Sequence, residues 1–318
     1  MARIRVPGGY LTATQFAVVA AAAAELGNGT IELTSRGNLQ VRGLADGEEL
    51  SVRLAAAGLF PSATHERVRN ITASPLAPSL RPVVSALDAA LCADQELATL
   101  PGRFQFAVDD GRGDVAWSDV DVALVGDAIL LGGVDSGLRG DPVALALACA
   151  RAFLRVRTTE WRLAEVPDGP RRIAELVGAP GPPTLSGSPV TRGPLGPAGE
   201  FVVAGAPLGR LGPRQTAALA GANLVITPWR SIVVPARVDG LAAAGFLLDP
   251  AAPQVTACIG RPGCAKSLAD VQADAEPLAG VTLPVHWSGC ARRCGRPRGA
   301  VVDVVATEAG YQVTRGER

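Results

Sequence analysis

The 318-residue chain contains a degenerate internal repeat, and this repeat restricts its fold more than any other feature. The similar pairs of segments are 8–26 with 208–220, 31–44 with 224–237, 53–61 with 241–250, and 71–74 with 255–258. The comparison pairs Gln15 with Gln215 and Arg36 with Arg230, and it places Ser74 where the second copy has Cys258. Such a repeat predicts two similar units that pack as a pseudo-dimer.

Each copy has the pattern of a small sheet covered by helices. In the first copy a strand (RIRV) precedes a helix for which Thr12 is a good N-cap, and Gln15 completes a capping box. Two short alternating strands, IELT and LQVRG, follow, and a second helix begins at Asp46. The order strand–helix–strand–strand–helix predicts an α+β fold with helices on one face of the sheet.

The segments that follow each repeat predict a second, larger sheet. RFQFAVD and DVALVGDAILLGG have strand patterns, helices are expected over 82–93 and 141–157, and VTLPVHW and AVVDVVA are the counterparts in the second half. A stretch dense in Pro and Gly separates the two halves and has the composition of an extended linker. The expected division is 1–66, 67–176, the linker 177–200, 201–252 and 253–318.

Four cysteines near the C-terminal end form two close pairs. They are Cys258 and Cys264 in ACIGRPGC, and Cys290 and Cys294 in SGCARRC. Four thiolates in loops rich in Gly and Arg predict a soft-metal site, and the gap of five residues in the first pair favours an iron–sulfur cluster over zinc. Zinc and unligated cysteines remain as alternatives, whereas disulfides are not expected. Cys92 and Cys149 lie in apolar helical patterns and are expected in the core.

Composition excludes some classes of function. The formal net charge is zero, which gives no general attraction to nucleic acid or to an acidic membrane. No apolar run is long enough to span a membrane, and the N-terminus lacks a signal-peptide pattern, so we expect a cytoplasmic protein. Lys266 is the only lysine, so nearly every basic site is an Arg fork suited to carboxylates.

Several phrases together resemble the nitrite/sulfite reductase family of siroheme and iron–sulfur proteins. They are RIRVPGGYLT, LTSRGNLQVRGL, the RN of RVRNITASP, LPGRF and the two cysteine pairs, and they extend over nearly the whole chain. The resemblance implies a pseudo-twofold repeat of ferredoxin-like half-domains and cluster-domain halves around a central cavity. GRPGCAKSLADVQADA and SGCARRCGRP are most similar to the oxygen-using branch of the family, which acts in aerobic cobalamin biosynthesis.

The resemblance also implies roles for particular residues. Cys258, Cys264, Cys290 and Cys294 would hold a [4Fe-4S] cluster, and in the reductases the last thiolate, here Cys294, bridges to siroheme iron. The matching residues for binding the carboxylates of a macrocycle are Arg36, Arg69, Asn70 and Arg103, and the repeat adds Arg230.

One departure separates the branches of the family. Reductases carry two lysines in the phrase that here is LPGRFQ, with Arg103 and Gln105 in their places. Gln is neutral, and a lost charge-assisted hydrogen bond to a buried oxyanion weakens binding by roughly 1.5–3 kcal/mol. We therefore expect a monooxygenase that uses dioxygen on a tetrapyrrole, with a reduced pyridine nucleotide or another redox partner as electron donor. A siroheme-dependent sulfite or nitrite reductase and a non-catalytic zinc protein are the alternatives.

A mononuclear non-haem iron would be a second metal in the oxygenase. Such iron favours imidazole and carboxylate ligands, and the chain has only His65 and His286. Each is interpreted either as a site residue or as a structural histidine, and no ligand set is assigned. Trp229 is similarly open between stacking on a ligand and packing in the core. The chain begins almost directly on its first strand, so either its start lies further upstream or one cavity wall is formed differently from the family's.

Overall fold

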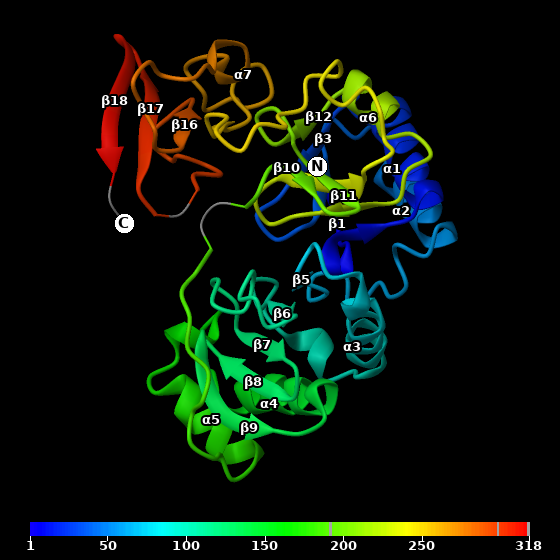
Figure 1. The fold of residues 1–318 in the computed structure, drawn as a ribbon, viewed down its shortest axis with the longest axis vertical. Coiled ribbons are helices and arrows are strands. Elements are labelled where there is room, and N and C mark those ends of the chain that lie inside the picture. The colour runs from blue at the N-terminus through cyan, green and yellow to red at the C-terminus, as the bar shows by residue number, and fades with distance from the viewer. Residues whose placement is uncertain (191–192, 298, 317–318) are drawn as a thin grey trace.

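The structure, a computed structural model, describes residues 1–190, 193–297 and 299–316, and the strands in these ranges form four sheets (Figure 1). We call them A, B, C and D. Sheet A has the order β1-β4-β3-β12, sheet B β10-β11-β14-β13-β2, sheet C β5-β6-β7-β8-β9 and sheet D β15-β16-β17-β18. The α+β architecture with a pseudo-twofold repeat is confirmed, because A corresponds to B and C to D.

Sheets A and B contain the strands of the first pair of repeated units, and with four and five strands they match sheets D and C in strand number. Their strands are β1 (Ala2–Ile4), β2 (Tyr10–Leu11), β3 (Ile31–Leu33), β4 (Leu39–Val41), β10 (Gly196–Ala198), β11 (Phe201–Gly205), β12 (Arg210–Leu211), β13 (Leu224–Ile226) and β14 (Ser231–Pro235). The helices of these halves are α1 (Ala13–Glu25), α2 (Gly47–Ala56) and α6 (Pro213–Ala218). The capping box of Thr12 and Gln15 is present at α1, and the Asp46 carboxylate caps α2, as the sequence predicted.

The two halves exchange a short strand. β2 of the first half pairs with β13 in sheet B, and β12 of the second half pairs with β3 in sheet A. One apolar core accordingly joins both halves, with Leu11 and Phe16 from the first and Leu211 and Leu224 from the second among its buried members. Burial of this shared core stabilises the pseudo-dimer, since each apolar Å² removed from water contributes roughly 25 cal/mol.

Sheets C and D have the same topology over their first four strands. Two parallel pairs are followed by an antiparallel one, β5-β6-β7-β8 in sheet C and β15-β16-β17-β18 in sheet D. The strands of C are β5 (Ile71–Ala73), β6 (Phe106–Asp109), β7 (Val122–Val125), β8 (Ala128–Leu131) and β9 (Val134–Arg139). Those of D are β15 (Val255–Ala257), β16 (Val285–Ser288), β17 (Val301–Thr307) and β18 (Gly310–Gly316).

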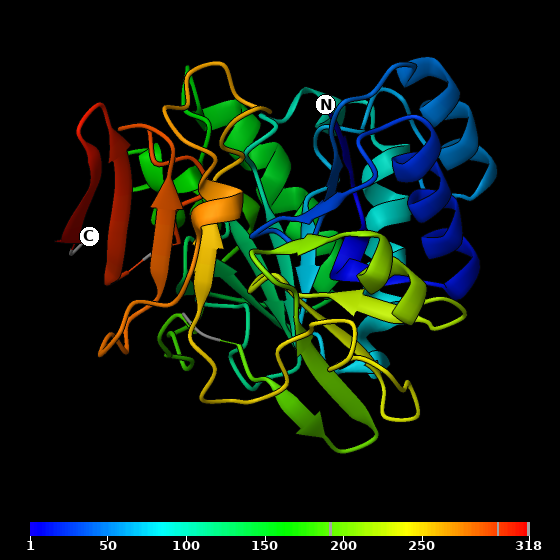
Figure 2. The ribbon, with the colours of Figure 1, turned by 90° about the horizontal axis from the view of Figure 1, so that it is seen from above.

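Helices cover sheet C, whereas sheet D has little helical cover. α3 (Arg81–Ala93), α4 (Pro142–Val156) and α5 (Gly169–Val177) lie with sheet C, and α7 (Val271–Asp274) lies beside sheet D (Figures 1 and 2). Short 3₁₀ turns are η1 (Pro7–Gly9), η2 (Pro78–Leu80), η3 (Leu97–Thr99) and η4 (Leu163–Glu165). Asp141 caps α4 with Pro142 at its first turn, as expected. The phrase DVALVGDAILLGG forms two strands, β7 and β8, because Gly126 turns the chain between them with a positive φ.

Within the predicted linker 177–200, Gly178–Val190 contains no helix or strand, which agrees with its Pro/Gly composition. The predicted bounds are too wide, because Val177 ends α5 and Gly196–Ala198 form strand β10 of sheet B. The Asp135 carboxylate holds this segment by accepting hydrogen bonds from the backbone N–H groups of Thr184 (2.7 Å) and Leu185 (2.9 Å). Residues 191–192 of the predicted linker, and 298 and 317–318 of the last predicted segment, lie outside the described residues.

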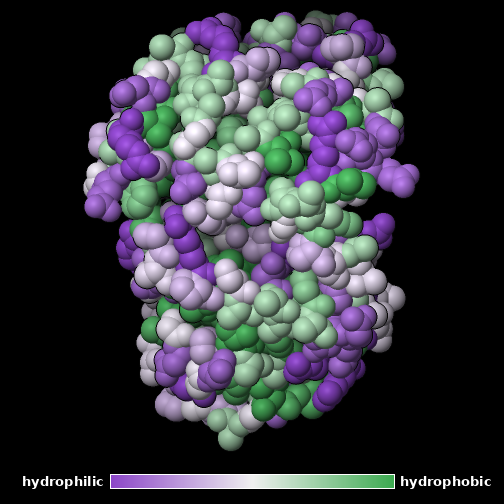
Figure 3. All heavy atoms as spheres, turned by 90° about the vertical axis from the view of Figure 1, so that its right-hand side faces the viewer, coloured by the Kyte–Doolittle hydropathy of each residue, from purple (hydrophilic) through white to green (hydrophobic). Residues whose placement is uncertain are grey.

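The face that carries α1, α2 and α3 mixes hydrophilic and hydrophobic side chains (Figure 3). In the described ranges, none of the helices combines the length and apolarity required to cross a bilayer.

Candidate functional site

A cavity of about 750 Å³ lies where the two halves and the linker meet. Its lining includes Arg36 from the first half, Trp229 and Arg230 from the second, and Thr72 and Thr256 from the first strands of sheets C and D. Linker residues Pro189, Val190, Gly193 and Leu195 complete part of the wall. The volume lies in the upper part of the range typical of small-molecule pockets.

Two equivalent turns deliver the arginines. In the first half Thr34 N–H donates to the Asn38 carbonyl (2.9 Å), and in the second half Thr227 N–H donates to Ser231 (3.0 Å). This register aligns Arg230 with Gly37, which shares its positive φ, and it aligns Arg36 with Trp229. The predicted pairing of Arg36 with Arg230 is therefore one residue out of register, although both side chains reach the cavity.

Arg36 and Arg230 are partly buried cations whose side chains donate to backbone carbonyls. Arg36 donates to the Gly102 carbonyl (3.3 Å) and Arg230 to the Gly295 carbonyl (2.9 Å). Within the described ranges, neither guanidinium has a carboxylate at ion-pair distance. Burial lowers the pKa of Arg36 to about 10, helped by the positive charge of Arg162, and burial also lowers the pKa of Arg230. Arg36 stays protonated at neutral pH, so the cavity favours an anionic ligand.

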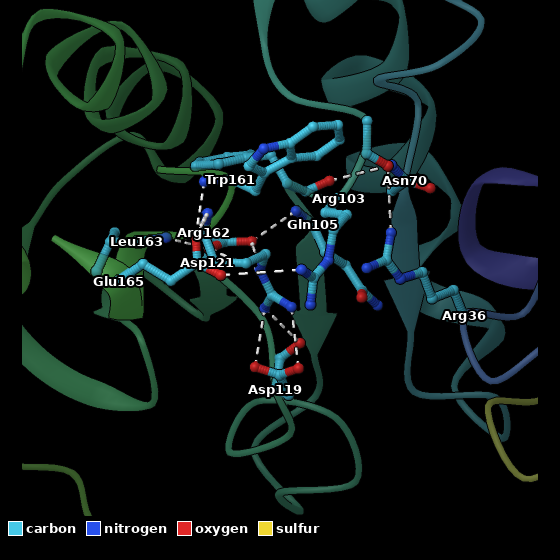
Figure 4. Close-up of polar contacts among 12 residues, drawn as sticks. Arg36, Asn70, Arg103, Gln105, Asp119, Asp121, Trp161, Arg162, Leu163 and Glu165 are labelled. Atoms are coloured by element: carbon cyan, nitrogen blue, oxygen red, sulfur yellow. Dashed lines mark hydrogen bonds and ion pairs between the residues drawn. The ribbon is translucent and has the colours of Figure 1, made fainter. Parts of the chain in front are cut away.

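Gln105 reaches the cavity beside Thr72, at a distance of 3.4 Å between Nε2 and the hydroxyl oxygen. The Asp121 carboxylate fixes its backbone by accepting from Gln105 N–H (2.8 Å), and Asp121 also binds Arg162 Nε (2.8 Å). The outer end of Arg162 binds the carboxylate of Asp119, another residue of the lining. Figure 4 shows this network beside Arg36.

The structure does not bring three of the predicted ligand-binding residues to the cavity wall. Arg69 is buried and makes a two-pronged ion pair with Asp88 (2.7 and 2.8 Å). The Asn70 amide donates to backbone carbonyls and its oxygen accepts from Arg5, so its polar atoms are occupied inside the fold. Arg103 is 57% exposed, with Glu165 at 3.9 Å. This geometry therefore gives no support to a ligand contact by these three residues.

The four C-terminal cysteines lie on two loops at one edge of sheet D. Cys258 follows β15 and Cys290 follows the parallel neighbour β16, so both occur at carboxyl ends of strands. The Cys258 sulfur accepts a hydrogen bond from Gly289 N–H (3.2 Å), which ties the two loops together. In sheet C, Ser74 occupies the place of Cys258: Ser74 N–H donates to Val108 as Cys258 N–H donates to Trp287. The repeat-based alignment of Ser74 with Cys258 is confirmed.

Four free thiols on adjacent loops fit the donor chemistry of a [4Fe-4S] cluster. Among the residues that the structure describes, no group of three or more Cys, His, Asp or Glu side chains is arranged to hold a metal ion. Ligation by Cys258, Cys264, Cys290 and Cys294 thus stays a prediction.

Of the other two cysteines, Cys149 is buried in the core, as expected, and burial raises its pKa to about 12. Cys92 is partly exposed on α3, so it is less deeply placed than its pattern predicted.

The two histidines have different surroundings. His65 is buried, with Nδ1 beside the Ser62 hydroxyl (2.8 Å) and Nε2 beside the Asp94 carbonyl (2.9 Å), which is the pattern of a structural histidine. His286 lies on β16, where Nδ1 contacts the Thr256 hydroxyl (2.8 Å). Its Nε2 has no hydrogen-bond partner in the described part of the chain, and burial, with the charge of Arg230, lowers its pKa to about 4.

Two tryptophans hold the linker against the cavity. Trp229 Nε1 donates to the Val190 carbonyl (3.0 Å), and a Cβ on Gly193 would come within 2.5 Å of its ring. Trp117 packs against Gly187 in the same way, since a Cβ on Gly187 would also come within 2.5 Å of the indole ring. Trp229 is therefore a linker contact that also lines the cavity.

Comparison with known proteins assigns the class of this protein. Residues 1–56 match the nitrite/sulfite reductase ferredoxin-like half domain. The structure of the NirA protein of Mycobacterium tuberculosis superimposes with a TM-score of 0.72 at 18% identity, covering 99% of this chain and 73% of that one. The structural match shows the fold of this chain, and the half-domain match places its first 56 residues within that fold.

Two known enzymes align with nearly the whole chain. Precorrin-3B synthase of Sinorhizobium sp is 30% identical over 374 aligned positions, which cover 98% of this chain and 78% of that protein. Ferredoxin–nitrite reductase of Synechococcus elongatus is 26% identical over 390 positions, which cover 97% and 76%. Both relatives are oxidoreductase-type enzymes. The identity and coverage of the first relative show that the chain belongs to the nitrite/sulfite reductase family, whose members usually bind a [4Fe-4S] cluster and siroheme.

Some lining residues escaped the sequence-based prediction. Thr72 and Thr256 face the cavity from equivalent positions, and each hydroxyl donates to a neighbouring strand, at the Phe106 and Val285 carbonyls. The repeat of ITA and VTA was the available signal for this pair. The network of Asp121 and Arg162 left no signal, because its members are 41 residues apart in sequence.

Proposed function

We propose that this protein is a monooxygenase similar to precorrin-3B synthase, which converts precorrin-3A to precorrin-3B. The observation that carries the proposal is the cavity with Arg36 and Arg230, two partly buried guanidinium groups from opposite halves that lack carboxylate partners in the described residues. A tetrapyrrole with acetate and propionate arms supplies carboxylates on opposite sides of one ring, and each guanidinium is suited to bind one of them by two parallel hydrogen bonds.

In the proposed reaction one atom of dioxygen enters the substrate at a meso carbon and the other leaves as water, with two electrons and two protons consumed. A neighbouring acetate arm closes the lactone. The electrons come from a reduced pyridine nucleotide or a redox partner, and a [4Fe-4S] cluster held by Cys258, Cys264, Cys290 and Cys294 would supply one-electron transfer. A mononuclear iron is a second expected metal, without assigned ligands.

The residues of the chain would bind and orient the ring. Arg36 and Arg230 fix its carboxylates, and the walls from the linker and both turns limit access of water. Gln105 offers a neutral amide where the reductases of the family have a lysine. A neutral group cannot grip and protonate a small oxyanion as an ammonium does, and this favours the oxygenase over reduction of sulfite or nitrite.

Absorption spectroscopy of the anaerobically purified protein separates the candidate functions. A broad cluster shoulder without sharp tetrapyrrole bands supports the oxygenase. Strong siroheme bands would instead support the reductase, and a colourless protein that contains zinc would support the non-catalytic alternative.

Binding of uroporphyrin III, an octacarboxylate tetrapyrrole, tests the cavity directly. Arg36→Ala should weaken binding about 10- to 100-fold, since a charged hydrogen bond contributes about 1.5–3 kcal/mol and each 1.4 kcal/mol is tenfold. Arg171→Ala is the matched control, because this arginine is 63% exposed on α5 and is outside the cavity lining. Equal affinities of the wild-type protein and Arg36→Ala would remove Arg36 from the binding site.

A further inference from the structure

Arg230 lies between the cavity and the loop of the last two cysteines. Its side chain lines the cavity, and its Nη2 donates to the carbonyl of Gly295, the residue after Cys294, at 2.9 Å. A guanidinium has five N–H donors in a planar fork, and this is its one hydrogen bond among the described residues. The remaining donors are available to a ligand.

The backbone at Arg230 is unfavourable for any residue with a side chain. Its φ is +59°, in the left-handed region, which costs roughly 1–2 kcal/mol for an L-residue other than Gly. The equivalent position of the first turn is Gly37, with φ +65°, so the fold accommodates Gly at this place. Strain of this kind is concentrated at functional sites, where the side chain has a use that offsets the cost.

The surroundings leave room for the side chain. A Cβ on Gly209 would come within 2.7 Å of Arg230 Cδ, so the glycine opens the path along which the arginine extends. At the far end, a Cβ on Gly295 would lie 3.7 Å from Arg230 Nη2 and 3.9 Å from His286 Cε1, so the guanidinium ends among groups of sheet D.

We propose that Arg230 is a positioning residue that couples ligand binding in the cavity to the loop of Cys290 and Cys294. One cation holds the Gly295 carbonyl and a ligand carboxylate at the same time, so that binding of the anion immobilises the loop. The inference rests on the proposed function, because it takes the anionic tetrapyrrole of that proposal as the ligand. It adds that tetrapyrrole binding reduces the mobility of the loop that carries Cys290 and Cys294, two of the predicted cluster cysteines.

Three measurements on the purified full-length protein test the coupling. Hydrogen–deuterium exchange of residues 290–297 is followed with and without uroporphyrin III, and affinity and melting temperature are measured for the wild-type protein, Arg230→Ala and Arg230→Gly. The Ala variant keeps the unfavourable backbone conformation, whereas the Gly variant relieves it. Both remove the guanidinium.

We expect uroporphyrin III to slow exchange of the loop at least about tenfold in the wild-type protein and to leave it unchanged in both variants. Both variants should lose affinity about 10- to 100-fold. Arg230→Gly should nevertheless melt about 2–4 °C higher than Arg230→Ala, since it removes the strain. Without a ligand, exchange of the loop should be faster in both variants than in the wild-type protein, because the bond to Gly295 is lost.

The outcomes separate the two proposals. If the wild-type protein binds uroporphyrin III but the exchange of residues 290–297 does not change, the coupling is wrong and the proposed ligand class survives. If the wild-type protein does not bind uroporphyrin III, the proposed ligand class is wrong. Faster exchange in the ligand-free variants would then still support the tie between Arg230 and the loop, and unchanged exchange would refute it.

Discussion

The ion pair of Asp121 and Arg162 behind the cavity wall gives the sharpest stability prediction. Arg162 has two acidic partners, Asp121 and Asp119 (Figure 4), and their carboxylates differ in burial and in the backbone N–H groups that Asp121 also binds. The side chain of Asp121 is 1% exposed, and that of Asp119 is 40% exposed. Replacing each by Asn removes the same charge from the same cation in two different environments.

The contacts set the expected magnitude for Asp121→Asn. One carboxylate oxygen accepts from Gln105 N–H (2.8 Å) and the other from Leu163 N–H (2.6 Å), and both contact Arg162 Nε. An Asn has a single acceptor oxygen, so one buried N–H group loses its partner, at a cost of about 1–3 kcal/mol. Because the substitution also removes the negative charge beside the buried Arg162 guanidinium, the total loss of stability should reach about 3–5 kcal/mol.

Asp119→Asn should cost only about 1 kcal/mol, because the Asp119 side chain is 40% exposed and water can replace part of its contact with Arg162. The backbone carbonyl of Asp119 continues to accept from Arg162 (2.8 Å) in this variant. At roughly 2 °C per kcal/mol for a chain of this size, thermal unfolding should shift by about 6–10 °C for Asp121→Asn and by about 2 °C or less for Asp119→Asn. Equal shifts in the two variants would refute the argument from the burial and backbone hydrogen bonds of Asp121.

Two further predictions concern the linker and the strand exchange. Hydrogen bonds from Arg139 and from linker N–H groups lower the pKa of Asp135. Its stabilising effect should therefore be complete above the unfolded pKa of about 3.9 and should be lost as the pH falls towards the lower folded pKa. The difference in melting temperature between the wild-type protein and Asp135→Asn should accordingly shrink below about pH 4. Gly9→Ala should destabilise the protein strongly in denaturant titrations, because the new Cβ would lie 2.1 Å from the Ile226 carbonyl oxygen across the exchanged strands. Gly29→Ala is the control, because Gly29 also has a positive φ (+78°) but a Cβ there would have no atom within 4 Å. This variant should lose only about 1–2 kcal/mol of stability, for the backbone conformation. Equal losses of stability in the two variants would contradict the steric argument.

Local and repeated features of the fold could be predicted from the sequence. Thr12, Asp46 and Asp141 mark helix starts because a side-chain cap acts within three residues of sequence. The repeat correctly predicted that Ser74 and Cys258 occupy equivalent positions, since each follows the first strand of its sheet. The exchange of β2 and β12 could not be predicted, because a two-residue strand has no periodicity and its partner is far away in the chain.

The site was predicted only in part, for a related reason. A sequence shows that an arginine is present but not whether a carboxylate already neutralises it. Arg36 and Arg230 reach the cavity without such a partner in the described residues, whereas Arg69 is neutralised by Asp88. The misaligned pairing of Arg36 with Arg230 had a local cause, since the five-residue turn that sets the register can be recognised only from its backbone hydrogen bonds and the positive φ of Gly37.

The exchanged strands also constrain the order of events during synthesis. When the first half leaves the ribosome, the edge of β3 has no neighbour, because Arg210 and Leu211 have not yet been translated. An open strand edge is a template for wrong pairing, and long-range contacts of this kind form slowly. The nascent first half therefore exposes an unpaired strand edge until the second half is made, and two separately expressed halves would each carry the strand that the other lacks.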